Sequence, residues 1–243
     1  MTPDIPKQPF MYNDFAYALN TLKHAITTAK PYMLLTGESG TGKTMMLRMI
    51  KNTVEKNNIS ILYCSLTKSS TYGLEQIIAD HLHLPLHKTK GETEKLIIQT
   101  LKIMPQRLLI LMDEAHYIHE DTLHQIRMLS EADLEYNSLF SILFAALPIL
   151  RKKLKEPQLI PCMRRINTKV TLKSMMHEEI QPFVKHLNIK NNTFSQQGLA
   201  YIFEQARGIP ALIENLIFEC VNSSKNEHIT QKEVSNVIEL NVY

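Results

Sequence analysis

The chain has 243 residues, of which 44% are hydrophobic and 21% are charged. The length suits one α/β domain with a small additional part, and the composition is typical of a soluble globular protein. No apolar run reaches the roughly 18 residues of a membrane helix, and the N-terminus lacks the basic and then apolar build of a secretory signal. Three widely spaced cysteines indicate a reduced, intracellular protein, so we expect a cytoplasmic location without membrane insertion.

The net charge of +3 is distributed unevenly. Residues 151–173 contain eight basic side chains and one acidic side chain, a net charge of +7, so the rest of the chain carries −4. The basic character is therefore local.

The hydrophobic pattern in the first two thirds of the chain predicts alternating strands and helices. Three prolines in residues 1–12 indicate an extended arm, and helical spacing begins at Asn13, a plausible cap. Alternation of this kind predicts a parallel five-stranded sheet sandwiched by helices. The expected strands are 32–36, 60–66, 107–112, 139–145 and 167–172, with helices after the first strand to about 54 and within 74–82, 94–101 and 123–134.

After Met175 the pattern predicts helices without strands. Pro210 suits a first helical turn, and Thr230 with Glu233 forms a capping box. We therefore expect three parts: an arm over 1–12, an α/β domain over 13–174 and a helical subdomain over 175–243. The expected helices of the last part are 178–187, 196–207, 210–222 and 230–240.

Residues 37–44 read GESGTGKT and match the phosphate-binding pattern G-x-x-x-x-G-K-[ST]. A loop that wraps phosphates needs inward backbone N–H groups and conformations that suit glycine, and a helix N-terminus adds partial positive charge. An ordinary glycine-rich turn is the alternative, which the flanking strand and helix disfavour. We expect Lys43 to reach the β- and γ-phosphates of ATP and the Thr44 hydroxyl to hold Mg²⁺. The expected phosphate-binding residues are Gly37, Glu38, Ser39, Gly40, Thr41, Gly42, Lys43, Thr44 and Met45.

Asp113 and Glu114 follow the most apolar strand. In a parallel α/β sheet, this strand end lies beside the phosphate loop. We therefore expect Asp113 to act in the Mg²⁺ shell and Glu114, on the other side of the strand end, to act as the general base for the attacking water. The alternative is that both acids cap the next helix.

The histidines offer weaker signals. His116 completes the letters of a DEAH-box helicase, but such enzymes need a second motor domain for which this sequence has no room. His116 with His119, or His81 with His83 and His87, could also bind a metal. Neither set contains the cysteine or carboxylate that completes such a site, so we interpret them as surface residues.

The basic segment has three candidate roles. Arg164 or Arg165 could act in trans as a catalytic arginine finger on a neighbouring subunit's ATP. Lys152, Lys153 and Lys155 could contact nucleic-acid phosphates. A solvated helix face is the usual explanation for a run of charges.

These motifs, in the order LLTGESGTGKT, LLILMDEAH, LPILRKKL, RRI and GIPALIENL, resemble AAA+ ATPases of the ExeA type. That group includes general-secretion ATPases and transposition ATPases of the TniB, TnsC and MuB types, and the likeness runs from about Pro9 to the C-terminus. It implies a helical lid, ATP between sheet and lid, and rings or filaments that bring an arginine to the next subunit's nucleotide. Leu147 and Ala211 depart from the family pattern, which often has a polar residue and an arginine there, so we expect slow hydrolysis.

The resemblance leaves several functions open. Because the sequence ends at Tyr243 without the membrane span and wall-binding part of secretion members, our leading hypothesis is an ATP-dependent DNA-binding transposition helper. Such a protein would assemble on double-stranded DNA and recruit or activate a transposase. The alternative is a cytosolic ATPase that drives or regulates a secretion or assembly complex of proteins. A small-molecule kinase with the same phosphate loop is the third and least favoured hypothesis.

Overall fold

The computed structural model describes residues 8–54, 58–67, 73–86, 90–131, 139–189, 193–224 and 226–241. The chain forms two compact units. One comprises residues 18–38 and 43–171, and the other comprises residues 1–17, 39–42 and 172–243. No helix in the described ranges is long and apolar enough to cross a membrane.

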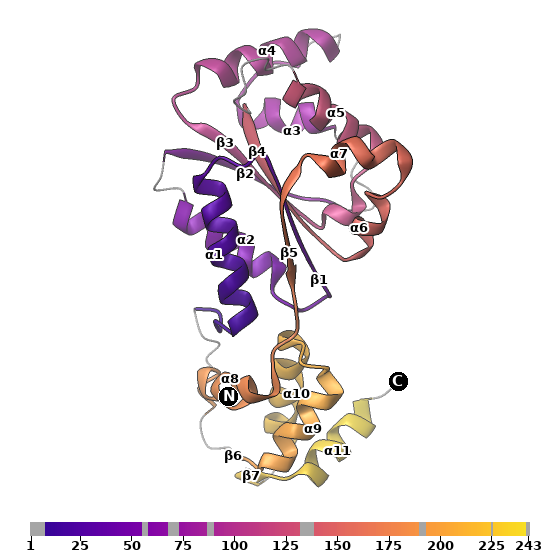
Figure 1. The fold of residues 1–243 in the computed structure, drawn as a ribbon. Helices are drawn as coiled ribbons and strands as arrows, with labels where there is room; N and C mark the ends of the chain where they lie inside the picture. The colour runs from indigo at the N-terminus through magenta and orange to yellow at the C-terminus, as the bar shows by residue number, and fades with distance from the viewer. Residues whose placement is uncertain are drawn as a thin grey trace. The chain divides into compact units, whose positions relative to one another are not determined.

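The larger unit is built around a five-stranded sheet with the strand order β2-β3-β4-β1-β5 (Figure 1). The pairs β2–β3, β3–β4 and β4–β1 are parallel, with Asp113 opposite Ser65 and Thr36 opposite Ala146 at the carboxyl ends. All residues of β1 and β4 are buried, as expected for central strands covered on both faces. The strands are β1 (Tyr32–Gly37), β2 (Ile59–Ser65), β3 (Arg107–Asp113), β4 (Phe140–Ala146) and β5 (Ile166–Leu172).

Helices cover both faces of this sheet (Figure 1). Because strand side chains alternate between faces, Leu34, Ile110 and Ile142 join one core, with α3, α4, α5, α6 and α7. Helix α2 packs against β1, β3 and β4, and α1 lies with it on one side of the sheet (Figure 1). The helices are α1 (Asn13–Thr27), α2 (Lys43–Val54), α3 (Leu74–His81), α4 (Lys90–Ile103), α5 (Glu120–Glu131), α6 (Ile149–Lys153) and α7 (Ile160–Arg164), with short 3₁₀ turns η2 (Ala115–Tyr117) and η3 (Pro157–Leu159).

The smaller unit contains the C-terminal helices and the segment that precedes α1. Helices α9, α10 and α11 pack on one another, while Phe10 lies against Phe183 with 5.3 Å between ring centroids. Ser195 caps α9 by accepting a hydrogen bond from the Gly198 N–H group at 3.0 Å. The elements are η4 (His177–Glu179), α8 (Ile180–His186), β6 (Thr193–Phe194), α9 (Gln196–Ala206), α10 (Pro210–Ser223), β7 (His228–Ile229) and α11 (Gln231–Asn241).

The fold class expected from the sequence is confirmed: a parallel five-stranded sheet flanked by helices, followed by a helical region. The prediction of helices alone after Met175 missed the short parallel pair β6–β7. Helices α6 and α7 were also not predicted. The expected positions of His87 and Leu134, and the first seven residues of the arm, lie outside the described ranges.

Candidate functional site

Lys43 is the first residue of α2, and its side chain folds back onto the phosphate loop. The residue is 6% exposed, and its ammonium group donates to the Gly37 and Glu38 carbonyls, both at 2.9 Å. Burial lowers the pKa of Lys43, while the carboxylates of Glu114, Asp113 and Glu38 oppose that shift. An ammonium group has three N–H donors, so these carbonyls fix its position and leave it able to donate to a phosphate oxygen.

Thr44 and Asp113 are joined directly, from the first turn of α2 and the carboxyl end of β3. The Thr44 hydroxyl donates to Asp113 Oδ2 at 2.8 Å. The Tyr63 hydroxyl, from β2, donates to the same oxygen at 3.1 Å. Burial and then the negative charge of Asp113 raise the pKa of Tyr63 to about 12, so this hydroxyl keeps its proton at neutral pH. Sequence reasoning missed Tyr63, because its role depends on the pairing of β2 with β3.

Glu114 ends the strand in the left-handed region, at φ 51° and ψ 34°. Its N–H group donates to Asp113 Oδ1 at 2.9 Å. Because β3 ends at Asp113, strand alternation does not determine the direction of the Glu114 side chain. The Glu114 side chain is 40% exposed, which suits a group that must reach water.

His116 lies beside this carboxylate. Its Nδ1 atom is 3.3 Å from Glu114 Oε2, and its side chain is 7% exposed. The ring also lies against that of Tyr117, with 4.1 Å between centroids and an angle of 41° between the ring planes. The interpretation of His116 as a surface residue is wrong, whereas His119 is exposed. Among the described residues, no group of three histidine, cysteine or acidic side chains is arranged to hold a metal ion.

The middle of the phosphate loop, residues 39–42, belongs to the smaller unit. Gly40 and Gly42 have φ of +81° and +99°, which favour glycine. A Cβ atom on Gly40 would lie 2.9 Å from a methyl carbon of Ile209 and 3.0 Å from Cβ of Ala211. The start of α10 therefore contacts the loop through Ala211, the position at which the family pattern often has arginine.

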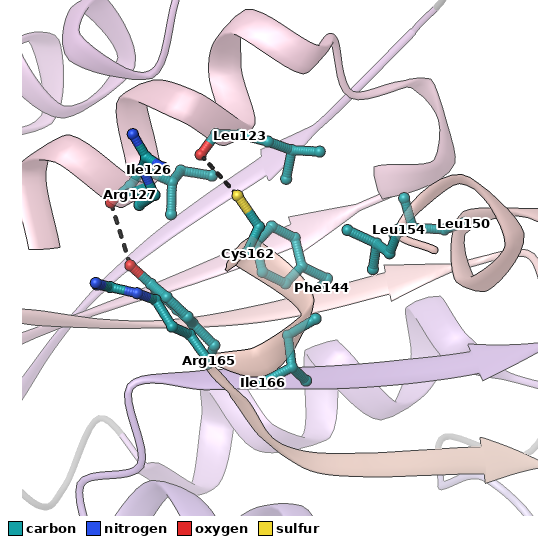
Figure 2. A pocket seen from close by; sticks show the side chains of 10 residues that line it. Leu123, Ile126, Arg127, Phe144, Leu150, Leu154, Cys162, Arg165 and Ile166 are labelled. Carbon is teal, nitrogen blue, oxygen red and sulfur yellow. Dashed lines mark hydrogen bonds between the residues drawn. The ribbon is translucent and has the colours of Figure 1, made fainter. Parts of the chain in front are cut away.

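Arg164 and Arg165 end the α7 segment in different environments. Arg164 is exposed and Arg165 is half-buried. Figure 2 shows Arg165 at a small cavity whose wall includes Arg127 and Phe144. Cys162 donates to the Leu123 carbonyl across this cavity at 3.6 Å. The structure thus gives the two arginines different surroundings, and Arg164 is the more accessible.

Helix α6 and the residues after it carry the rest of the basic segment. Lys152 and Lys155 are exposed, and Ile149 is 60% exposed. Lys153 instead donates to the Ile118 carbonyl at 2.6 Å, so it fixes the turn after β3. Leu147 directly follows β4.

Several of the predicted metal- and phosphate-binding groups of the larger unit lie together. The hydroxyl of Thr44 and the carboxylate of Asp113 are hard oxygen ligands of the kind Mg²⁺ prefers. The buried ammonium group of Lys43 and the helix N-terminus at the same residue suit the anionic phosphates of a nucleotide. The residues present therefore fit a magnesium nucleotide.

A family model described as an AAA domain matches residues 26–154, more than half of the chain. The chain is 28% identical over 225 residues to general secretion pathway protein A of Aeromonas hydrophila. That alignment covers 87% of this chain and 40% of the relative, so the chain spans less than half of that protein's length.

Solved structures with the same fold have low sequence identity. Cdc6p of Pyrobaculum aerophilum matches with a TM-score of 0.72 at 16% identity, covering 100% of this chain and 70% of that one. An ORC2 protein of Aeropyrum pernix, in ADPNP–ADP complexes, matches with a TM-score of 0.68 at 12% identity, covering 100% and 71%. A RuvB variant of Thermotoga maritima matches with a TM-score of 0.60 at 16% identity, covering 94% and 68%. The family match and the fold together show that the chain belongs to the AAA domain family, as an AAA+ ATPase similar to general secretion pathway protein A.

Proposed function

We propose that this chain binds ATP with Mg²⁺ and hydrolyses it to ADP and phosphate. The observation that carries the proposal is the 2.8 Å hydrogen bond from the Thr44 hydroxyl to Asp113. It joins the end of the phosphate loop to the acid that ends β3, beside the buried ammonium group of Lys43.

Each residue has a separate role in the proposed reaction. Lys43 donates to the β- and γ-phosphate oxygens, and Thr44 and Asp113 hold the ion. When bound, Mg²⁺ neutralises the charge that develops on the phosphates. Glu114 accepts a proton from the attacking water, since its carboxylate is partly exposed next to this pair.

Equilibrium binding of a fluorescent ATP analogue, with and without Mg²⁺, tests this proposal. Wild-type protein should bind more tightly with Mg²⁺, and Asp113→Asn should lose that dependence. Phe144→Leu, a change in the apolar core that contains residues of α3 to α7, would control for a general loss of packing. A wild-type affinity that does not respond to Mg²⁺ would contradict the assigned roles of Thr44 and Asp113.

The similarity to general secretion pathway protein A favours a protein complex as the object of this ATPase. We propose that nucleotide binding drives or regulates a protein complex for secretion or assembly, which is the alternative hypothesis drawn from the sequence. Affinity capture from the native cell, in the presence of ATP and then ADP, should recover the same partner in a nucleotide-dependent manner. Equal recovery with both nucleotides would contradict this role.

The basic segment favours a second candidate, the DNA-binding transposition helper. Lys152 and Lys155 are exposed, and residues 151–173 contain eight basic side chains and one acidic side chain. A structural neighbour, the ORC1 protein of Aeropyrum pernix, was solved in complex with DNA and matches with a TM-score of 0.64 at 12% identity. We propose that these side chains contact phosphates of double-stranded DNA, on which the protein assembles and recruits a transposase.

Salt dependence separates the two candidates. Each phosphate contact contributes roughly 0.9 to the slope of log affinity against log salt. The double variant Lys152→Ala/Lys155→Ala should lower this slope for duplex DNA, whereas Lys51→Ala/Lys102→Ala, which changes exposed lysines of α2 and α4, should leave it unchanged. If the wild-type protein does not bind DNA at low salt, the transposition-helper role is contradicted and the protein-assembly role remains.

We also propose that subunits assemble so that Arg164 reaches a neighbour's ATP. Arg164→Ala should then lose hydrolysis while it retains ATP binding. Mixing Arg164→Ala with Lys43→Ala should restore part of the activity, because the second variant supplies the arginine and the first supplies an intact site. A mixture as inactive as the separate variants would contradict a role in trans for Arg164.

A further inference from the structure

Two consecutive carbonyl groups in the middle of the phosphate loop are held by donors from outside the loop. The Gly40 carbonyl accepts a hydrogen bond from the Ala211 N–H group at 3.2 Å. The Thr41 carbonyl accepts one from the Tyr12 hydroxyl at 2.9 Å, in a buried setting. All of these residues belong to the smaller unit.

These two hydrogen bonds determine where the next two N–H groups point. In a trans peptide the C=O group and the following N–H group point in opposite directions. The N–H group of Thr41 therefore points away from Ala211, and that of Gly42 points away from Tyr12. Backbone N–H groups bind phosphate in a loop of this type. The hydrogen bonds that orient the two carbonyls therefore also orient the N–H groups that would bind phosphate.

Tyr12 is itself held in place on several sides. It is 3% exposed, and its ring lies 5.6 Å from that of Phe15. Its hydroxyl is also 3.1 Å from the Lys173 carbonyl, and the Lys173 N–H group donates to Asp14 at 2.7 Å. The segment before α1 is thus fixed to the start of the C-terminal helical region.

Two further features fix Tyr12 as a donor. The N–H group of Asn13 donates to Glu179 at 2.7 Å, which anchors the residue next to Tyr12. Burial raises the pKa of Tyr12, as do the negative charges of Asp14 and Glu179. The phenol therefore keeps its proton across the physiological range and can serve a carbonyl as a donor.

We propose that Tyr12 is a positioning residue for the nucleotide: its hydroxyl holds the Thr41 carbonyl outward, so that the Gly42 N–H group faces the bound phosphates. Tyr12 lies outside the matched family segment, residues 26–154, and the sequence-based assignment of the phosphate-binding residues did not include it. The inference rests on the proposed binding of ATP. It assigns part of the phosphate affinity to a side chain about 30 residues before the loop in the sequence.

The test uses Tyr12→Phe, which removes the hydroxyl and keeps the ring. Tyr17→Phe is the matched control, since Tyr17 lies on α1 and is 68% exposed. Inhibition constants of tripolyphosphate and of adenosine are measured against a fluorescent ATP analogue, on the full chain. Thermal unfolding without nucleotide checks that Tyr12→Phe is folded.

We expect Tyr12→Phe to weaken tripolyphosphate and MgATP by the same factor, about three- to tenfold, the usual range for one buried hydrogen bond. The adenosine constant should stay at the wild-type value, and Tyr17→Phe should match wild type throughout. Unchanged tripolyphosphate binding, or an equal loss for adenosine, overturns the inference. Loss of binding in Lys43→Ala, measured in parallel, shows separately that the phosphate site itself is correctly assigned.

Discussion

Lys43 is buried, and its ammonium group contacts two carbonyls of the phosphate loop. Its ammonium group lies on two loop carbonyls at 2.9 Å, and burial lowers its pKa. Lys43→Ala removes a charged donor from the phosphate site, so ATP affinity should fall about 10- to 100-fold. Titration calorimetry would measure it, with Lys51→Ala on the same helix as a control. An unchanged affinity would be inconsistent with the proposed contact.

The contact between His116 and Glu114 should affect the rate of hydrolysis rather than binding. One carboxylate oxygen of Glu114 lies 3.3 Å from His116 Nδ1, so the imidazole limits the positions that this carboxylate can take in its proposed role as base. His116→Ala should lower kcat by roughly tenfold through lost orientation, with ATP affinity unchanged. His116→Asn, which keeps a nitrogen donor near that position, should recover part of the rate.

His119→Ala is the control for this experiment, since His119 is exposed three residues later. Steady-state ADP release and equilibrium ATP binding would be measured for all three variants. A His116→Ala protein with wild-type or higher kcat would show that the contact does not position Glu114 for catalysis.

At the scale of elements, Gly208 determines the connection between α9 and α10. Its φ is +68°, and an added Cβ atom would lie 2.7 Å from the Met175 carbonyl oxygen. Gly208→Ala should therefore lower the free energy of unfolding by about 2 kcal/mol or more. Urea unfolding would measure this loss.

Gly91 provides the opposite expectation within the same chain. It lies in α4, and an added Cβ atom meets nothing within 4 Å. Gly91→Ala should raise the free energy of unfolding by about 0.5 kcal/mol, because alanine favours the helix. Equal effects of the two substitutions would contradict the assigned strain at Gly208.

The strands were predictable from the sequence because buried parallel strands are continuous apolar runs. Strand β3 is the expected run 107–112 extended by one residue, and β5 is the expected run 167–172 extended by one residue. Helices α6 and α7 have five residues each, too short for a helical period to be recognised. The strands therefore followed from the local hydrophobic pattern, whereas α6 and α7 depend on tertiary packing.

The candidate site was predictable where a motif fixes residues at set spacings, as with the phosphate loop. Tyr63 and Tyr12 could not be found in this way. The first reaches Asp113 from 50 residues away, and the second reaches Thr41 from 29 residues away. The burial of the His116 side chain could not be predicted, because residue type and spacing do not show how the chain packs around it.

At the scale of the whole molecule, nucleotide binding should stabilise the fold by mass action. MgATP at about one hundred times its Kd should add about 2.7 kcal/mol to the free energy of unfolding. Thermal unfolding with increasing MgATP would show a rising midpoint for wild type and a nearly constant one for Lys43→Ala. A midpoint that responds equally in both would place the bound nucleotide elsewhere.

Turnover by the isolated chain should be slow. Leu147 follows β4 without a polar group, and Ala211 contributes a backbone N–H group to the Gly40 carbonyl in place of an arginine side chain. We expect steady-state ADP release that is far slower than ATP binding, and that rises when protein concentration or the correct partner favours assembly. Fast, concentration-independent turnover would contradict this expectation.

The identity of the nucleotide bound to Glu114→Gln tests the central claim most directly. The substitution keeps the shape of the side chain and removes its ability to accept a proton, so Thr44, Asp113 and Lys43 should still bind MgATP. After incubation with MgATP and rapid removal of free nucleotide, chromatography should find ATP on Glu114→Gln and ADP on the wild type. ADP on both proteins in equal amounts would contradict the role of Glu114 as the base.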